Sequence, residues 1–188
     1  MDVKPLAIPE VKLVTPPIFR DGRGFFSETY NRAALAAAGI GADFVQDNQS
    51  LSRARGVVRG LHFQCNPHPQ GKLVRVVRGA IYDVAVDIRR GSPTYGRHVA
   101  ATLSAENWAQ LWVPVGFAHA FCTLEPDTEV IYKVTDFYVP ECDRGLAFDD
   151  PDLGIAWPVP VRDMILSDKD RRHPRLRDLP AYFSYAPS

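Results

Sequence analysis

Short runs of alternating and β-branched residues dominate the middle of the chain. Residues 72–77 and 81–88 are two such runs, and the Arg78-Gly79 dipeptide between them predicts a hairpin turn. Side chains two positions apart share one face of a strand. The second run therefore has an apolar face, made of Tyr82, Val84, Val86 and Ile88. Its other face carries two acids and is made of Asp83, Ala85 and Asp87.

Further short apolar runs follow, separated by glycine and proline. They predict strands at residues 99–103, 110–113, 118–124 and 129–136. Strands of this length and spacing are typical of an antiparallel sandwich or barrel, so the sequence predicts an all-β fold.

One helix interrupts the strand pattern. Asn31 can cap its start, residues 32–38 are mostly alanine and leucine, and Gly39 can close it. A single turn is expected at residues 104–107. The segment 151–188 is rich in Pro, Asp and Arg, so we expect it to wrap the barrel as loops and short helical turns. No repeat or linker divides the chain, which predicts one domain over residues 1–188.

Composition narrows the function classes. Lys plus Arg and Asp plus Glu both number 22 among 188 residues, and no basic run appears, which argues against a nucleic-acid partner. No apolar stretch is long enough to cross a membrane and no leader is evident, so we expect no membrane association and a cytoplasmic location. Cys65, Cys122 and Cys142 are odd in number and widely spaced, and we interpret them as packing residues.

Several polar residues fall on strand faces that are otherwise apolar. His62 shares its face with Gly60 and Gln64, His119 lies between two phenylalanines, and Tyr132 lies between two valines. Taken singly, such a residue is more often a hydrogen-bonded core residue than a catalyst. Side chains from separate strands of one barrel can, however, converge on a single cavity.

The segment 114–119 reads Pro-Val-Gly-Phe-Ala-His and resembles the second motif of the cupin superfamily. Gly56 followed by His62 resembles the opening of the first motif. In metal-binding cupins the first motif continues as His-x-His and then a glutamate. Here Gln64 stands at the second histidine position and no glutamate follows at the expected distance. Two histidines fall short of a usual transition-metal ligand set, so the sequence predicts no metal site.

A histidine kept in a metal-free cavity is suited to general base catalysis, because imidazole titrates near neutral pH. Removal of a proton next to a carbonyl needs a base, a group that stabilises the enolate, and an acid for the return step. His62 can be the base, Lys72 can stabilise the enolate oxygen, and Tyr132 can return a proton on the opposite face. Such a sequence of steps inverts a stereocentre.

The strongest signal is a set of segments that together are similar to the dTDP-4-dehydrorhamnose 3,5-epimerase family. They are residues 21–28, 44–48, 58–64, 70–75, 129–133, 148–151 and 166–170, which keep the order of the family. The resemblance implies a cupin-type antiparallel β-barrel or jelly roll with a few short helices. It also implies a cofactor-free isomerase that acts on a dTDP-linked 4-keto-6-deoxy sugar.

The resemblance also implies roles for individual residues. His62 matches the proton acceptor, Asp170 its carboxylate partner and Tyr132 the proton donor, with Lys72 beside the sugar carbonyl. The implied substrate-binding residues are Arg23, Glu28, Gln46, Asp47, Asn48, Arg59, Lys72, His119, Tyr138, Asp143 and Lys169. Asp143 is a departure, because the family has a glutamate there. Family members are homodimers with exchanged N-terminal strands, so Arg23 and Glu28 are expected to reach across an interface.

The predicted reaction inverts C3 and C5 of dTDP-4-dehydro-6-deoxy-D-glucose and gives dTDP-4-dehydro-L-rhamnose, without a cofactor because no redox change occurs. One alternative is an epimerase that inverts a single centre with the same groups. The others are a metal-dependent cupin enzyme, which Gln64 argues against, and a module that binds a sugar nucleotide without turnover. Read separately, Arg23 and Glu28 are also compatible with surface charges, Lys72 with a strand-edge residue and Asp170 with a cap.

Overall fold

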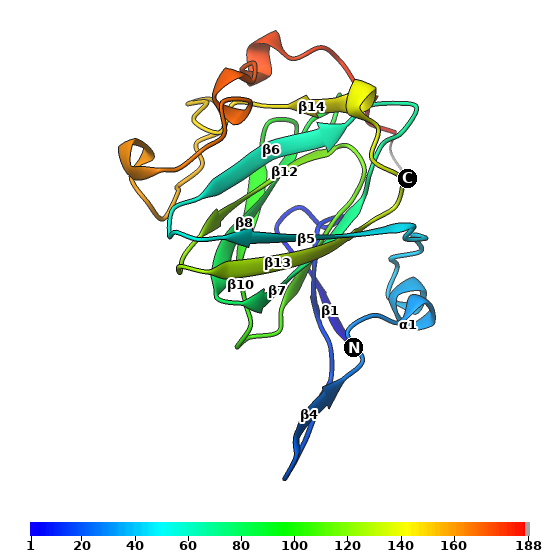
Figure 1. The fold of residues 1–188 in the computed structure, drawn as a ribbon. Coiled ribbons are helices and arrows are strands. Elements are labelled where there is room, and N and C mark those ends of the chain that lie inside the picture. Colours follow the sequence, from blue (N-terminus) through cyan, green and yellow to red (C-terminus); the bar gives the residue numbers. More distant parts are fainter. Residues whose placement is uncertain (187–188) are drawn as a thin grey trace.

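Two antiparallel β-sheets lie face to face in the computed structural model, which describes residues 1–186 (Figure 1). The first sheet has the strand order β1 (Asp2–Pro5), β2 (Lys12–Thr15), β11 (Gln110–Val113), β7 (Lys72–Arg78), β13 (Thr128–Val134) and β5 (Gln46–Ser52). The second has the order β10 (His98–Ser104), β8 (Ala80–Asp87), β12 (Phe117–Thr123), β6 (Val58–Gln64) and β14 (Asp143–Gly145). The predicted all-β fold is confirmed, as two open sheets rather than a closed barrel.

The main hydrophobic core fills the space between the two sheets. Val74 and Leu111 of the first sheet pack in one cluster with Ile81, Ala85 and Leu103 of the second, and all five are fully buried. Alternation along each strand sends every second side chain into this space, which is why the apolar residues of the sequence are spaced by two.

The outer face of the second sheet is covered by the C-terminal segment. Val84 and Val86 of β8 and Leu61 of β6 pack against Leu153 and Leu176. Both faces of β8 are therefore buried, including the face that carries Asp83 and Asp87. The expected short helical turns are present at η2 (Val161–Asp163), η3 (Asp170–Arg172) and η4 (Leu176–Asp178), and a short strand β15 (Phe183–Ser184) pairs with β9 (Arg89–Arg90).

The predicted hairpin between residues 72–77 and 81–88 is wrong. Strands do occupy these positions, but β7 pairs with β11 and β13, whereas β8 pairs with β10 and β12. The connection at Gly79 instead carries the chain from one sheet to the other. Gly79 has φ +74°, and a Cβ there would lie 2.4 Å from the Thr128 hydroxyl oxygen. Glycine marks a tight turn, but local sequence does not show which strands become neighbours.

The predicted helix is confirmed as α1 (Arg32–Ala37). Asn31 Oδ1 accepts a hydrogen bond of 3.0 Å from the Ala34 backbone N–H, and Gly39 follows the helix with φ +77°. Leu35 buries its side chain against the first sheet. The turn expected after β10 is also present, because the Asn107 N–H donates to Ser104 Oγ over 3.0 Å.

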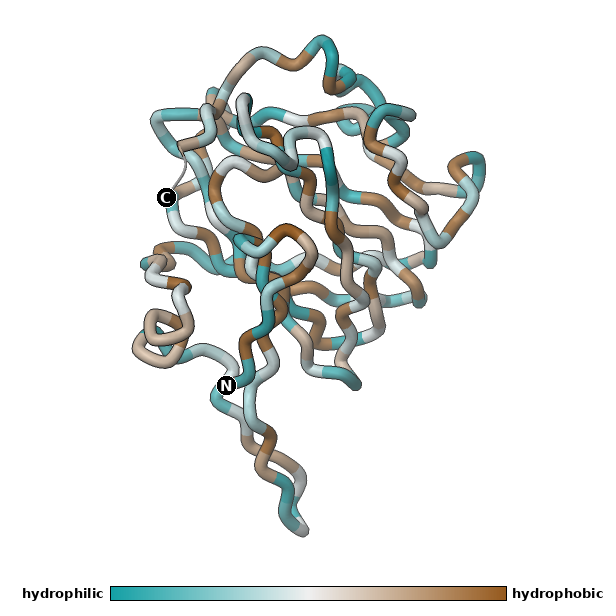
Figure 2. Tube along the Cα trace, turned by 180° about the vertical axis from the view of Figure 1, so that it is seen from behind, coloured by the Kyte–Doolittle hydropathy of each residue, from teal (hydrophilic) through white to brown (hydrophobic). Residues whose placement is uncertain are grey.

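A hairpin arm, formed by β3 (Ile18–Asp21) and β4 (Gly24–Ser27), projects away from the sheets (Figures 1 and 2). It carries Phe19, Phe25 and Phe26 with 60%, 59% and 68% of their surface exposed. Apolar side chains exposed together on a protruding element are typical of an interaction surface. Within residues 1–186, no helix has the length and apolar character needed to cross a membrane.

Truncation of Leu103, which is fully buried between the sheets, tests this packing. We expect Leu103→Ala to lower the free energy of unfolding by about 2–5 kcal/mol, because it leaves a cavity in a close-packed core. Val161→Ala, at a side chain that is 51% exposed, is the control and should change it by less than about 0.5 kcal/mol. Urea unfolding followed by circular dichroism measures both. Equal losses of unfolding free energy in the two variants would contradict the placement of Leu103 in the core.

Candidate active site

A cavity of about 450 Å³ lies between the two sheets, and the segment 165–170 borders it. His62 of β6 and His119 of β12 reach it from the second sheet, while Lys72 of β7 and Tyr132 of β13 reach it from the first. Asp170 enters from η3 in the C-terminal segment. The structure thus brings together the base, acid, enolate-stabilising residue and carboxylate partner expected from the sequence.

His62 and Tyr132 come from opposite walls of this cavity. β6 belongs to the second sheet and β13 to the first, and strand alternation turns both side chains into the space between the sheets. Val130 and Val134, on the same face of β13 as Tyr132, are buried in the structure. A cyclic substrate held between the walls would present one face to the imidazole and the other to the phenol.

Asp170 orients the His62 imidazole. Its Oδ1 lies 2.6 Å from His62 Nε2, and the carboxylate is only 4% exposed. Burial opposes ionisation of Asp170, but the imidazoles of His173 and His62 outweigh it, so the pKa of this carboxyl lies well below its usual range. An ionised acceptor fixes the proton of neutral His62 on Nε2. Nδ1 is then the ring nitrogen left to accept a proton.

Burial sets the protonation states around the base. It lowers the pKa of His62 below 6.5, and although Asp170 offsets part of this shift, the net direction favours neutral imidazole. Burial also lowers the pKa of Lys72 to about 8, against the opposing pull of Asp143 and Asp83. Lys72 Nζ donates a 3.4 Å hydrogen bond to the His62 carbonyl oxygen. Burial raises the pKa of Tyr132, so the phenol keeps its proton.

His119 has a carboxylate partner that the sequence argument did not assign. Its Nε2 lies 2.6 Å from Oδ1 of Asp83, a fully buried residue on the neighbouring strand β8. The pair holds the His119 ring against the cavity wall. The available signal was Asp83 itself, an acid in the middle of an otherwise apolar strand, since a buried carboxylate needs a partner.

Comparison with known proteins follows this geometry. The family model described as dTDP-4-dehydrorhamnose 3,5-epimerase matches residues 5–178. This chain belongs to the dTDP-4-dehydrorhamnose 3,5-epimerase family. The family member from Sinorhizobium fredii is 55% identical over 180 residues, which cover 96% of this chain and 92% of that protein.

Two crystal structures of family members are closely similar. The dTDP-6-deoxy-D-glucose-3,5-epimerase of Legionella pneumophila in complex with dTDP-4-keto-L-rhamnose has a TM-score of 0.94 at 42% identity, covering 99% of both chains. The epimerase of Bacillus anthracis with TDP and PPi bound has a TM-score of 0.89 at 49% identity, covering 93% of this chain and 98% of that one. The predicted cupin-type jelly roll of the epimerase family is confirmed.

A smaller recess of about 330 Å³ adjoins the cavity and shares His62, Lys72, Tyr132 and Lys169 with it. It contains most of the other side chains that the family resemblance implies: Gln46, Asn48, Tyr138, Asp143 and Lys169. They form a network in which Gln46 donates to Asn48 Oδ1 over 2.9 Å, Tyr138 donates to Asp143 Oδ2 over 3.1 Å, and Lys169 pairs with the same carboxylate. Asp143, shorter than the family's glutamate, still reaches these partners.

Arg59 lines the main cavity, where it donates to Ser52 Oγ and to the Leu51 carbonyl oxygen over 3.3 and 3.2 Å.

The side-chain amide of Gln64 forms hydrogen bonds to backbone groups of neighbouring loops. Its amide donates to the His68 and Phe137 carbonyl oxygens and accepts from the Val139 N–H. Gln64 therefore ties two loops to β6, which explains an inward amide at the position where metal-binding cupins have a histidine.

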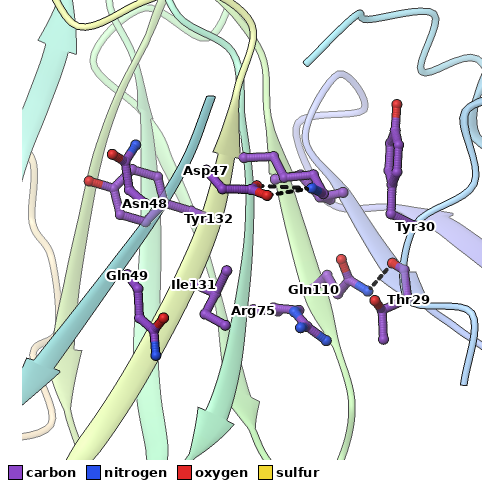
Figure 3. Close-up of a pocket in the computed structure, with 11 residues that line it drawn as sticks. Thr29, Tyr30, Asp47, Asn48, Gln49, Arg75, Gln110, Ile131 and Tyr132 are labelled. Carbon is purple, nitrogen blue, oxygen red and sulfur yellow. Dashed lines mark hydrogen bonds and ion pairs between the residues drawn. The ribbon is translucent and has the colours of Figure 1, made fainter. Parts of the chain in front are cut away.

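Asp47 lies outside this cavity, so its predicted substrate contact stays a prediction. Alternation along β5 turns Asn48 toward Tyr132 and Asp47 to the other side of the sheet (Figure 3). There Asp47 forms an ion pair of 2.9 Å with Lys133 and lines a neighbouring hollow of about 420 Å³, which Asn48 and Tyr132 also border. The motif in the sequence includes this residue, but only the strand register shows which of its side chains face the site.

Arg23 and Glu28 also lie away from this cavity, at or beside the hairpin arm. Arg23 donates to Asp21 over 2.6 Å, and Glu28 accepts a 2.9 Å hydrogen bond from Asn31. Their predicted substrate contacts therefore require the arm of a second copy. The prediction that these residues reach across an interface stays a prediction.

The ionisations of His62 and Lys72 predict a bell-shaped dependence of kcat/KM on pH. His62 must be neutral to accept a proton, and its pKa lies below 6.5. The acid limb of the profile, where His62 becomes protonated, should therefore lie below pH 6.5. Lys72 must be an ammonium ion to stabilise the enolate, so activity falls above about pH 8. Lys72→Arg should move the alkaline limb upward, because a guanidinium keeps its charge. An unchanged alkaline limb would show that another group titrates there.

Proposed function

We propose that this chain is a 3,5-epimerase of dTDP-4-dehydro-6-deoxy-D-glucose and releases dTDP-4-dehydro-L-rhamnose. The observation that carries the proposal is the opposition of His62 and Tyr132 across one cavity. Inversion needs a base on one face of the sugar and an acid on the other, whereas binding alone needs neither. We place the reaction in the cytoplasm and propose that the whole chain acts as one domain.

Proton abstraction comes first. The C4 ketone acidifies the C–H bonds at C3 and C5, because the resulting carbanion is delocalised as an enolate. His62 Nδ1 accepts the proton, and Asp170 stabilises the imidazolium through Nε2–H. Lys72, protonated below pH 8, neutralises the enolate oxygen in a buried setting where the interaction is strong.

Reprotonation from the opposite wall completes the inversion. Tyr132 keeps its proton in the free enzyme because burial raises its pKa, and Arg59 partly offsets that shift. A nearby cation also stabilises the phenolate that forms when Tyr132 donates. Before the second inversion, His62 releases its proton to solvent and Tyr132 takes one up, and the same steps then invert the second carbon, with Tyr132 or a water molecule as the acid.

Substrate binding uses the residues that surround this centre. The planar guanidinium of Arg59 is suited to the diphosphate oxygens. The recess lined by Gln46, Asn48, Asp143 and Lys169 offers donors and acceptors for the remaining polar groups of the substrate. Tyr138, 54% exposed at the rim, is positioned for stacking on the thymine base.

The decisive experiment is incubation with dTDP-4-keto-6-deoxyglucose in heavy water, followed by proton NMR. The wild type should incorporate deuterium at both C3 and C5. His62→Ala should slow exchange at both positions by about 10²–10⁴-fold, because the base is lost. Tyr132→Phe should retain His62-dependent exchange but lose inverted product. His68→Asn, which alters a histidine outside the cavity, is the matched control.

Exchange at wild-type rates in a folded His62→Ala protein would refute the assignment of the base. Label at a single carbon in the wild type would instead indicate an epimerase that inverts one centre. Binding of the nucleotide sugar without any exchange would indicate a binding module.

We further propose a homodimer in which each hairpin arm packs on a second copy. The support is the set of three exposed phenylalanines on the arm and the position of Arg23 near its tip. Burial of such side chains stabilises an interface by about 25 cal/mol per Å² of apolar surface removed from water. Arg23 and Glu28 would then complete the partner's substrate site.

Phe26→Asp should shift the protein from dimer to monomer, because it places a charge in the proposed interface. Light scattering after size exclusion measures this shift. Arg23→Ala should leave the dimer intact, because the apolar contacts of the arm remain. It should raise KM, because it removes a proposed substrate contact. A monomeric wild type, or an unchanged KM in Arg23→Ala, would contradict this arrangement.

A further inference from the structure

A third side chain converges on the catalytic pair. Among residues 1–186, one group of three metal-ligating side chains has its donor atoms within 4.8 Å of one another: His62, Asp170 and His173. Neither the epimerisation steps nor the substrate contacts derived above use His173. It follows Asp170 by three positions, directly after η3, and its ring lies edge-on to that of His62 at a centroid distance of 5.6 Å.

Nε2 of the His173 imidazole is buried beside Asp170 without an aligned hydrogen bond. Its side chain is 9% exposed, and Nε2 has no hydrogen-bond partner. The nearest acceptor is Asp170 Oδ1, the oxygen that already binds His62 Nε2, at 3.5 Å. A buried ring nitrogen with no aligned partner costs free energy, so its position beside a carboxylate and a second imidazole needs an explanation.

We propose that His62 Nε2, Asp170 and His173 Nε2 form a binding site for a divalent transition metal ion, zinc in particular, and that the bound ion inhibits the epimerase. Two imidazoles and one carboxylate are a familiar zinc ligand set that leaves a fourth position for water. With bonds of about 2.0–2.1 Å in tetrahedral geometry, neighbouring ligand atoms are about 3.3 Å apart. The separation of His173 from Asp170 already fits, and the 2.6 Å contact of His62 opens by less than one ångström.

Inhibition follows from which ring nitrogen of His62 carries the proton. Neutral imidazole carries one proton, which Asp170 holds on Nε2 in the metal-free enzyme, so that Nδ1 is the base. A metal ion bound through Nε2 forces this proton onto Nδ1. The nitrogen that must accept the substrate proton is then occupied, and Asp170 becomes a metal ligand. This consequence rests on the proposed role of His62, whereas metal binding itself does not.

Charges around the site limit the affinity. Lys72 and Lys169 line the cavity together with His62 and Asp170 and oppose a divalent cation, while the Asp170 carboxylate attracts it. Binding therefore depends on all three donors together. Loss of His173 leaves two ligands, too few to hold zinc tightly.

Calorimetric titration of the EDTA-treated full chain with zinc chloride tests the site. We expect one zinc ion per chain in the wild type. Its affinity should fall by about tenfold or more, equal to at least about 1.4 kcal/mol, in His173→Asn, which keeps a polar side chain but removes the Nε2 donor. His68→Asn, at a histidine paired with Asp136 outside the cavity, should bind zinc as the wild type does. Equal zinc affinity in the wild type and His173→Asn, or no binding, would overturn the site.

Deuterium exchange at C3 and C5, measured with and without zinc, tests inhibition separately. Zinc should suppress exchange in the wild type, EDTA should restore it, and His173→Asn should need about tenfold more zinc for the same loss. Undiminished exchange in a zinc-saturated wild type would overturn the inhibition. If the metal-free protein shows no exchange at all, the proposed epimerase function fails, while the calorimetric result still decides the metal site.

Discussion

The hydrogen bond between His62 Nε2 and Asp170 Oδ1 joins two parts of the molecule that are far apart in sequence. His62 belongs to strand β6 of the second sheet, and Asp170 to the segment that wraps the outer face of that sheet. Neither group alone makes a base at this position. An isolated buried imidazole has no fixed tautomer, and an isolated buried carboxylate is driven toward its neutral form. Packing of the C-terminal segment therefore both covers the sheet and completes the pair that we propose as the catalytic base.

The sandwich architecture explains why the remaining groups work together. Two sheets that face each other supply two walls, and alternation along each strand supplies side chains at regular intervals on both. The inner faces are largely apolar, and His62, His119, Lys72 and Tyr132 are among the polar side chains that interrupt them. The same burial that stabilises the core lowers the pKa of Lys72 and raises that of Tyr132. Stability and reactivity therefore have one physical origin, the exclusion of water between the sheets.

Concentrating donors in one buried place has a second consequence. A carboxylate that orients an imidazole is also a metal ligand, and a second imidazole nearby turns a proton-transfer pair into a set of three donors. In the proposed mechanism, His62 is therefore a base only while Nε2 carries its proton. The chemistry of the site depends on what occupies the space between His62, Asp170 and His173 as much as on the residues themselves.

The sequence by itself determined the features that depend on local pattern. Alternating apolar positions predicted most central strands, Asn31 and Gly39 marked the helix, and the motif around His62 and Tyr132 indicated proton transfer. Tertiary structure decided the features that depend on long-range pairing. Alternation shows which side chains share a face but not which face is inward, so Asp47 and Asn48 were distinguished only by the register of β5 with β13. In the same way, Gly79 indicated a turn, while the separation of β7 from β8 into different sheets, and the approach of Asp170 and His173 to β6, required contacts between residues distant in the chain.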